Sequence, residues 1–226
     1  MFSLNKCLVR ACHNIAVSTI NENGDIVEEK NYCIDHSPNP GKLHQDIINY
    51  INTHEKIVGL CANGLNFSNI DFSGKRFYGC NFQRCTFTNV HSKGLRSRMS
   101  IFDFAVFTDC NIIESNIHFT SFSGCTFSRT LFTASELLQN NYNGINAVQS
   151  SFDDSDLYNS RFINSTLVNI SFRNCNLKKV LFHGIKQENV SFKMSNTREA
   201  VFDQNGSELS KDIANSGEKS ALGDVL

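Results

Sequence analysis

Phenylalanine recurs at every fifth residue over most of this chain, and this period is the feature that most limits its fold. Sixteen of the 19 Phe share one register, which runs from Phe67 to Phe202. Ile, Leu and Tyr occupy most other positions of that register, so 23 of its 28 positions are large and apolar. The exceptions are Ser92, Ser97, Ala147, Gln187 and Thr197. A period of five matches neither an α-helix nor an alternating strand, and it indicates a solenoid of short repeats.

The position two residues before each large one is restricted as well. It holds mostly Cys, Ser, Thr or Val, as at Cys80, Ser115, Ser155 and Cys175. One small and one large residue in every five predict two inward side chains per repeat. The other three positions are rich in Asn, Ser, Asp, Arg and Lys, and we expect them to face solvent.

Several of these units resemble the pentapeptide-repeat family, whose unit is roughly Ala-Asp/Asn-Leu-X-X. Good matches are Cys80-Asn81-Phe82, Ser155-Asp156-Leu157 and Cys175-Asn176-Leu177, and the resemblance covers about residues 65 to 202. It implies an all-β solenoid, a right-handed quadrilateral β-helix of about seven coils with four units per coil. Every twentieth residue should then stack in one column, and one such column is aromatic throughout: Phe82, Phe102, Phe122, Tyr142, Phe162, Phe182 and Phe202. At ~4.8 Å per coil, the rod would be roughly 35 Å long.

The segments outside the repeat suggest how the chain is divided. Ser37-Pro38-Asn39-Pro40-Gly41 is typical of a linker. Apolar residues at helical spacing over 42–58 predict a helix that covers the open end of the solenoid, with binding of a partner as its alternative use. We therefore expect a zinc-ribbon-like module at 1–37, a linker and N-terminal capping helix at 38–62, the β-helix at 63–203 and a flexible polar tail at 204–226.

The nine cysteines fall into two groups. Five occupy the small inward position, where a thiol behaves as a small buried hydrophobe: Cys80, Cys85, Cys110, Cys125 and Cys175. Because the total is odd and packing accounts for each of these, we predict reduced thiols rather than disulfides. Reduced thiols favour a cytoplasmic location. Cys61 lies outside the register, and we expect it in the capping layer.

The first 36 residues have the spacing of a metal site. Cys7-X4-Cys12 is followed by a predicted hairpin around Asn23-Gly24 and then by Cys33-X2-His36. The Tyr-Cys-X-X-His sequence resembles small zinc-ribbon or treble-clef modules. A segment this short cannot bury a sufficient core, whereas Zn²⁺ held by three thiolates and one imidazole can supply folding energy. We predict a structural Zn²⁺ on Cys7, Cys12, Cys33 and His36, with His13 as an alternative to His36.

Residues 91–100 interrupt the repeat. Ser92 and Ser97 replace large residues there, and the register resumes at Phe102. Either the coil continues with a poorly filled interior, or the segment loops out. Its three cations, Lys93, Arg96 and Arg98, make it the most basic stretch of the chain and a candidate binding element. The alternative is that these residues form an ordinary solvated turn.

Composition narrows the possible functions. The net charge of −1 does not favour a polybasic nucleic-acid binder, and we expect no direct nucleic-acid binding. No apolar run approaches the ~20 residues of a membrane span. The one Cys–His pair considered for catalysis, His54 with Cys61, has nothing in the sequence to orient or activate it. We therefore predict a protein that is not an enzyme.

The leading hypothesis is a non-catalytic protein-binding scaffold that uses the faces of the rod, with its partner and oligomeric state open. The resemblance implies two alternatives. Some members of the family mimic duplex DNA, bind type II topoisomerases such as gyrase and confer quinolone resistance. Those rods are typically acidic, whereas residues 65–202 carry 14 Lys and Arg against 10 Asp and Glu. The other alternative is a secreted bacterial effector, with the tail as its secretion signal.

Overall fold

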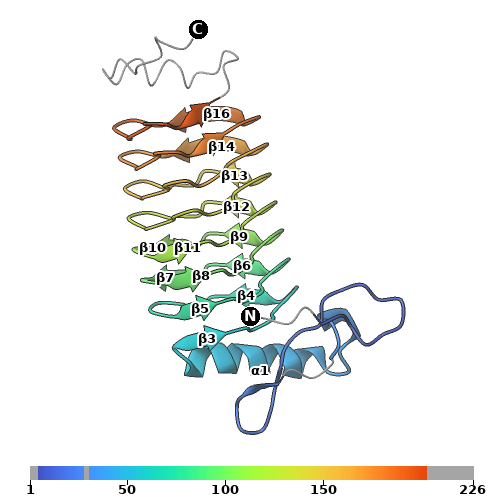
Figure 1. Ribbon diagram of the computed structural model, residues 1–226. Coiled ribbons are helices and arrows are strands. Elements are labelled where there is room, and N and C mark those ends of the chain that lie inside the picture. Colours follow the sequence, from blue (N-terminus) through green and yellow to red (C-terminus); the bar gives the residue numbers. More distant parts are fainter. Residues whose placement is uncertain (1–4, 28–30, 203–226) are drawn as a thin grey trace.

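The computed structural model describes residues 5–27 and 31–202, which form a four-sided β-solenoid with a helix and a small hairpin unit at its N-terminal end (Figure 1). The solenoid makes about seven turns. Each turn takes twenty residues, as the parallel pairs that link the first coil to the second show: Lys56–Arg76, Cys61–Asn81, Asn66–Thr86 and Asp71–His91. The predicted β-solenoid is therefore confirmed. The predicted tail, 204–226, lies outside the described residues.

The strands are short because the chain turns a corner every five residues. One side carries a four-stranded sheet of β3 (Lys56–Val58), β5 (Arg76–Tyr78), β8 (Arg96–Arg98) and β11 (Asn116–His118). A seven-stranded sheet contains β4 (Asn66–Ser68), β6 (Thr86–Thr88), β9 (Val106–Thr108), β12 (Thr126–Ser128), β13 (Asn146–Val148), β14 (Thr166–Ser171) and β16 (Lys186–Ser191). Two smaller pairs are β7 (His91–Lys93) with β10 (Asn111–Ile113) and β15 (Leu181–Phe182) with β17 (Val201–Phe202).

The large inward side chains form stacks along the rod. The rings of Phe82 and Phe102 have centroids 5.0 Å apart and planes 13° apart, and those of Tyr142 and Phe162 are 4.8 Å and 12° apart. These separations are close to the ~4.8 Å between neighbouring strands. One ring per coil therefore fills the interior without bending the backbone ladder, and each ring also meets the edges of rings from other columns.

The small inward position has a polar role that the sequence did not reveal. In many coils its hydroxyl or thiol donates a hydrogen bond to the carbonyl of the residue 23 positions earlier, and in others to the carbonyl two positions earlier, as Ser115 does to Ile113. Ser155 Oγ lies 2.7 Å from the oxygen of Phe132, and Cys125 Sγ lies 3.0 Å from that of Phe102. Ser, Thr and Cys can all donate this bond, which explains why they replace one another at this position.

Helix α1 (Pro40–Thr53) lies across the end of the rod next to β3 (Figure 1). It starts where Asn39 caps it, with Oδ1 accepting a 3.0 Å hydrogen bond from the Lys42 amide. Its buried face contributes Leu43, Ile47 and Ile51 to the hydrophobic core of the solenoid. This burial shields the apolar cross-section of the first coil from water.

The helix is shorter than the apolar spacing over 42–58 predicts. Its last residue is Thr53, and the next residues enter the first coil of the solenoid. There Ile57 pairs with Phe77 in the parallel ladder, and Arg76 donates its amide to the oxygen of Glu55 at 2.8 Å. Ladder pairing therefore replaces the last turn of the predicted helix. No helix among residues 5–27 and 31–202 is long and apolar enough to cross a membrane.

The predicted hairpin around Asn23-Gly24 is confirmed. Strands β1 (Thr19–Ile20) and β2 (Ile26–Val27) pair antiparallel, and Gly24 adopts the positive φ of 83° that the turn needs. Reciprocal bonds between Ser18 and Cys61 attach this unit to the first coil, because each amide donates to an oxygen of the other residue at 2.8 Å.

Candidate metal centre and the basic coil

Local backbone geometry brings Cys33 and His36 to the same side of a single turn. Cys33 is the N-cap of the short 3₁₀ helix η1 (Ile34–His36), and the His36 amide donates to the Cys33 oxygen at 3.1 Å. Side chains three residues apart eclipse one another in a 3₁₀ helix. Consequently, His36 Nδ1 lies 3.3 Å from Cys33 Sγ.

The other two cysteines come from a chain reversal that precedes the hairpin. Lys6 and Ile15 form an antiparallel bridge, and the Cys7 amide donates to the Asn14 oxygen at 2.9 Å. Cys12 lies inside this reversal. Its position relative to η1 is set by backbone bonds to the segment before Cys33: Leu8 donates to Asn31 and Val17 donates to Tyr32, both at 3.0 Å.

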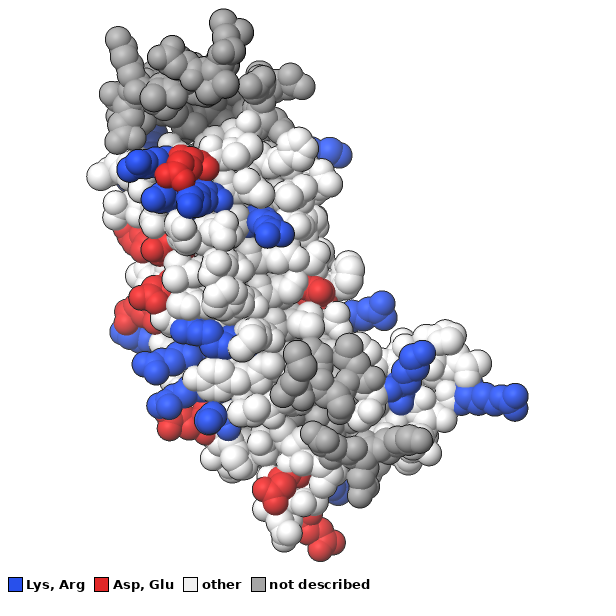
Figure 2. All heavy atoms as spheres, viewed as in Figure 1, with Lys and Arg blue, Asp and Glu red and all other residues white. Residues whose placement is uncertain are grey.

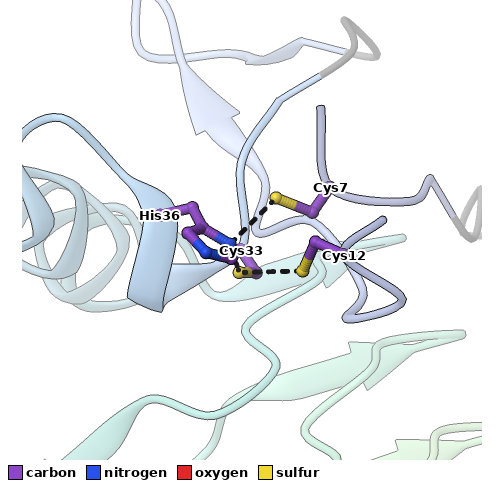
Figure 3. Close-up of side chains that lie close together, drawn as sticks. All are labelled: Cys7, Cys12, Cys33 and His36. Atoms are coloured by element: carbon purple, nitrogen blue, oxygen red, sulfur yellow. Dashed lines mark hydrogen bonds between the residues drawn. The ribbon is translucent and has the colours of Figure 1, made fainter. Parts of the chain in front are cut away.

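The four side chains converge on one point (Figure 3). Cys7 Sγ lies 3.6 Å from His36 Nδ1, Cys12 Sγ lies 3.9 Å from Cys33 Sγ, and all four candidate ligand atoms lie within 4.8 Å of one another. Tetrahedral Zn²⁺, with bonds of about 2.3 Å to sulfur and about 2.0 Å to nitrogen, would separate its ligands by ~3.8 Å (S to S) and ~3.6 Å (S to N). The donor set and its spacing therefore suit a metal ion of this size.

The surroundings of Cys7 favour its thiolate, whereas the neighbouring Cys7 and Cys33 side chains help to raise the pKa of Cys12. Burial raises the pKa of the Cys7 thiol, but backbone hydrogen bonds from Cys33 and Val9, together with the His36 side chain, outweigh this and lower it to about 6. Asn14 Nδ2 lies 4.0 Å from Cys33 Sγ and donates to Asp35 at 3.3 Å. Since the thiolate is the form that binds metal, these contacts prepare the cluster for a cation.

Other residues considered for metal binding or catalysis lie elsewhere. His36 belongs to the cluster, whereas the alternative ligand His13 is exposed and lies outside it. No hydrogen bond joins Cys61 to His54 within residues 5–27 and 31–202, and His54 Nδ1 lies 2.9 Å from the Tyr50 oxygen. Burial raises the pKa of Cys61 to about 11, so this thiol is not activated as a nucleophile. All nine cysteines are free, as predicted.

Residues 91–100 continue the solenoid and do not loop out. They contain β7 and β8, which pair in parallel with neighbouring coils. The three predicted binding cations differ in their surroundings. Lys93 forms a 3.0 Å ion pair with Glu114, and Arg98 is partly buried and donates to the Asn116 oxygen at 2.8 Å. Arg96 is exposed, and its guanidinium has no partner among residues 5–27 and 31–202.

Two family models match the solenoid. One, described as a pentapeptide repeat region, matches residues 125–202. The other, described as pentapeptide repeats (8 copies), matches residues 62–91 and 100–129. The matches together span more than half of the chain. This chain belongs to the pentapeptide-repeat family. The family matches leave out residues 92–99, the part of the basic coil in which Ser92 and Ser97 replace large inward residues.

Solved pentapeptide-repeat structures are similar to the chain in fold alone. QnrB1, a plasmid-mediated fluoroquinolone resistance protein, is 21% identical over 60% of this chain and 83% of its own, with a TM-score of 0.38. HetL, from the cyanobacterium Nostoc, is 10% identical over 69% and 93%, with a TM-score of 0.29. Rfr23, from the cyanobacterium Cyanothece, is 13% identical over 66% and 99%, with a TM-score of 0.25. No curated protein matches the chain.

Two exposed apolar residues next to the basic side chains were not predicted from the sequence. Met99 and Phe119 occupy the corner position of successive coils and are 68% and 55% exposed. A signal was available, because Phe119 lies outside the five-residue register that sixteen of the other Phe share. A Phe at a corner position of this repeat does not belong to the inward-facing column, so its side chain is expected to be exposed.

Proposed function

We propose that this pentapeptide-repeat protein is a non-catalytic, protein-binding scaffold in which Cys7, Cys12, Cys33 and His36 hold a structural Zn²⁺. On this proposal the chain divides as the sequence suggests, into a metal module at 1–37, a linker and capping helix at 38–62, the rod at 63–203 and a polar tail at 204–226.

The nearly filled interior is the observation that carries the scaffold proposal. Aromatic rings and aliphatic side chains occupy most of the axis of the rod, and the cavity beside Ser92 is only about 20 Å³. Within residues 63–202 the interior therefore offers no site of the size that a substrate needs. The outside, by contrast, is a set of flat parallel sheets held by backbone ladders. Rigid extended surfaces of this kind are what repeat proteins use to bind partners.

The ligand set supports a structural metal. Three sulfur atoms and one nitrogen make a closed tetrahedral set, whereas a catalytic zinc keeps one position for water or substrate. The segment around it has little core of its own, with Ala16 and Val17 as its buried aliphatic residues. A metal ion would supply the missing folding energy. Nine free cysteines are also compatible with a reducing compartment such as the cytoplasm.

Elemental analysis tests the metal. Protein purified without chelator should carry about one equivalent of zinc per chain, as the single four-ligand set requires. Less than about half an equivalent after zinc supplementation would count against the site.

Crosslinking of the full chain in its native cells, followed by mass spectrometry, tests the scaffold. A protein crosslinked to solenoid residues that then binds the purified chain in calorimetry would support the proposal. The absence of such a partner, or turnover of a substrate by the purified chain, would overturn it. Topoisomerase binding and secretion remain predictions. A gyrase supercoiling assay with and without a quinolone tests the first, and translocation of a tail-deleted chain tests the second.

A further inference from the structure

One corner of the solenoid carries bulky apolar side chains in an unfavourable backbone conformation. Met99 and Phe119 have φ values of 52° and 54°, the left-handed region that residues with a side chain rarely adopt. Gly79, one coil before Met99, and Asn159, two coils after Phe119, lie at the same corner. Gly and Asn tolerate this conformation better. Many other corner residues of the solenoid adopt this φ, so the conformation is common to the fold. Met99 and Phe119 differ in leaving two large apolar side chains exposed to water at the same corner of successive coils, which does not help folding.

A short column of cations lies on the adjoining sheet. The parallel register stacks Lys56, Arg76 and Arg96 in successive coils. Arg76 pairs with Glu55 at 2.6 Å, and Lys56 lies 5.8 Å from the centre of the Tyr78 ring. Within the described part of the chain Arg96 has no such partner, so its guanidinium is free to bind an anionic group.

Arg98 links the cation column to the apolar corner. It precedes Met99, and its guanidinium donates to the backbone oxygens of Ser97 and Asn116 and to the Asn116 side chain. On the next coil, the His118 and Phe119 rings meet edge to face with centroids 6.5 Å apart. These contacts hold cationic and apolar groups side by side on one edge of the rod, and interfaces are enriched in Arg, Met and aromatic residues.

The charge of this sheet reverses beyond the patch. After Arg96, the same column continues through Asn116 to the carboxylates of Glu136 and Asp156. Figure 2 shows the same alternation, with Lys and Arg beside β7 and β8 and Asp and Glu on the coils that follow. Three rungs of cations span only about 10 Å. A long polyanion such as duplex DNA would extend over the carboxylates, whereas a short acidic segment of a protein would not.

The coil that carries the patch also departs from the repeat inside the rod. Ser92 and Ser97 replace the large inward residues, and the buried hydroxyl of Ser92 has no hydrogen-bond partner in the described part of the chain. The family models leave out this part of the coil as well. An unpaired buried hydroxyl and two exposed apolar side chains on neighbouring coils do not help folding, and departures of this kind are typical of a functional surface.

We propose that the patch formed by Arg76, Arg96, Arg98, Met99 and Phe119 is the docking surface for an acidic, apolar-containing segment of a partner protein. Carboxylates of the segment pair with the guanidinium of Arg96 and its neighbours, and an apolar side chain covers the corner made by Met99 and Phe119. The inference rests on the proposed scaffold function and names both the surface and the chemistry of the partner.

A displayed library of random dodecapeptides, selected on the full chain, is the probe. We expect the selected peptides to combine Glu or Asp with Leu, Ile, Val or Phe. In fluorescence anisotropy, Arg96→Glu and Phe119→Asn should each lower the affinity of the chain for these peptides by more than about tenfold, as loss of a central contact does. Higher salt should lower this affinity as well, because it screens an exposed ion pair.

Matched variants separate the patch from general effects of charge and shape. Arg161→Glu reverses an exposed charge on another side of the rod, and Met194→Asn replaces an exposed Met with φ 62° at another corner. Both should leave peptide affinity within about twofold. Met99→Asn should weaken binding and raise the melting temperature, because Asn fits the left-handed corner better. This combination distinguishes a binding role from a structural one.

The inference is overturned if no peptide is enriched, if the selected peptides lack acidic residues, or if Arg96→Glu and Phe119→Asn leave binding unchanged. It is also overturned if duplex DNA displaces the peptides and binds more tightly than they do. A native partner that binds the rod normally after Arg96→Glu and Phe119→Asn would remove this surface while leaving the scaffold function intact.

Discussion

The sulfur atoms of Cys12 and Cys33 lie 3.9 Å apart although 21 residues separate them. The hairpin β1–β2 lies between them in the sequence, and backbone bonds on both sides of it bring the two segments together. This distance is the S-to-S spacing that one tetrahedral ion would impose. Single substitutions of the clustered cysteines can therefore test whether they hold a metal ion.

Cys12→Ser should remove the metal and loosen the segment around it. We expect zinc to fall from about one equivalent to a small fraction of that, because an alcohol ligand replaces a thiolate. Hydrogen exchange should accelerate over residues 5–27 and 31–37, while the amides of the rod keep their protection. Cys61→Ser is the matched control. Its sulfur lies outside the cluster, so equal loss of zinc in this variant would contradict the assignment.

Ser92→Val should stabilise the solenoid. Ser92 is 2% exposed, its Oγ has no hydrogen-bond partner, and a cavity of about 20 Å³ lies beside it. Valine removes the unpaired hydroxyl and places methyl groups in the cavity, so the free energy of unfolding should rise by about 1–2 kcal/mol in urea titrations.

Ser97→Val is the comparison for this variant. Its hydroxyl lies 3.2 Å from Thr120 Oγ1 in the buried interior. Valine removes that contact, so the variant should gain nothing or lose about 1 kcal/mol. Equal increases in the free energy of unfolding for Ser92→Val and Ser97→Val would show that removal of an unpaired hydroxyl does not explain the stabilisation.

Stability should fall at alkaline pH because of the interior thiols. Burial raises the pKa of Cys80 from 9.0 to about 12, despite hydrogen bonds that act in the opposite direction. Below about pH 9 the thiol is protonated in both folded and unfolded chains, and it contributes no pH dependence. Above that pH the unfolded chain loses this proton first, so stability falls by about 1.4 kcal/mol per pH unit for this residue.

Cys80→Ser isolates this contribution, because serine does not ionise in this range. Its hydroxyl can also donate to the Ile57 oxygen, as the thiol does at 3.5 Å. The stability difference between wild type and variant should be constant below about pH 8.5 and should shift by about 2 kcal/mol by about pH 10.5. A difference that stays constant over the whole range would refute the raised pKa.

Gly124→Ala should destabilise the chain more than Gly144→Ala. Both glycines have a positive φ, +66° and +67°, at the same corner of neighbouring coils. A Cβ at 124 would lie 2.6 Å from Cδ1 of Phe104, whereas nothing lies closer than 4.0 Å at 144. We expect a loss of about 1 kcal/mol at 144 and about 2 kcal/mol at 124 in urea denaturation. In a Phe104→Asn background the two costs should become equal.

Much of the rod could be predicted from the sequence because each coil repeats the same local requirement. A large residue every fifth position fits no helix or strand. The family resemblance implied four sides, and the aromatic column from Phe82 to Phe202 agreed with that implication. The cysteine and histidine spacings likewise predicted which side chains cluster at the N-terminal end, because Cys33 and His36 meet within a single turn. These features depend on contacts that are local or that recur at a constant spacing.

Only the tertiary structure decided whether the coil continues where the sequence departs from the repeat. Residues 91–100 stay in the coil because their backbone groups pair with both neighbouring coils. The Arg96 amide donates to the Lys75 oxygen, and the Leu95 oxygen accepts from the Asn116 amide. That backbone ladder does not depend on whether Ser or Phe points inward. Equally, Met99 and Phe119 form one exposed corner only when coils twenty residues apart stack, because stacking places them at the same corner of successive coils.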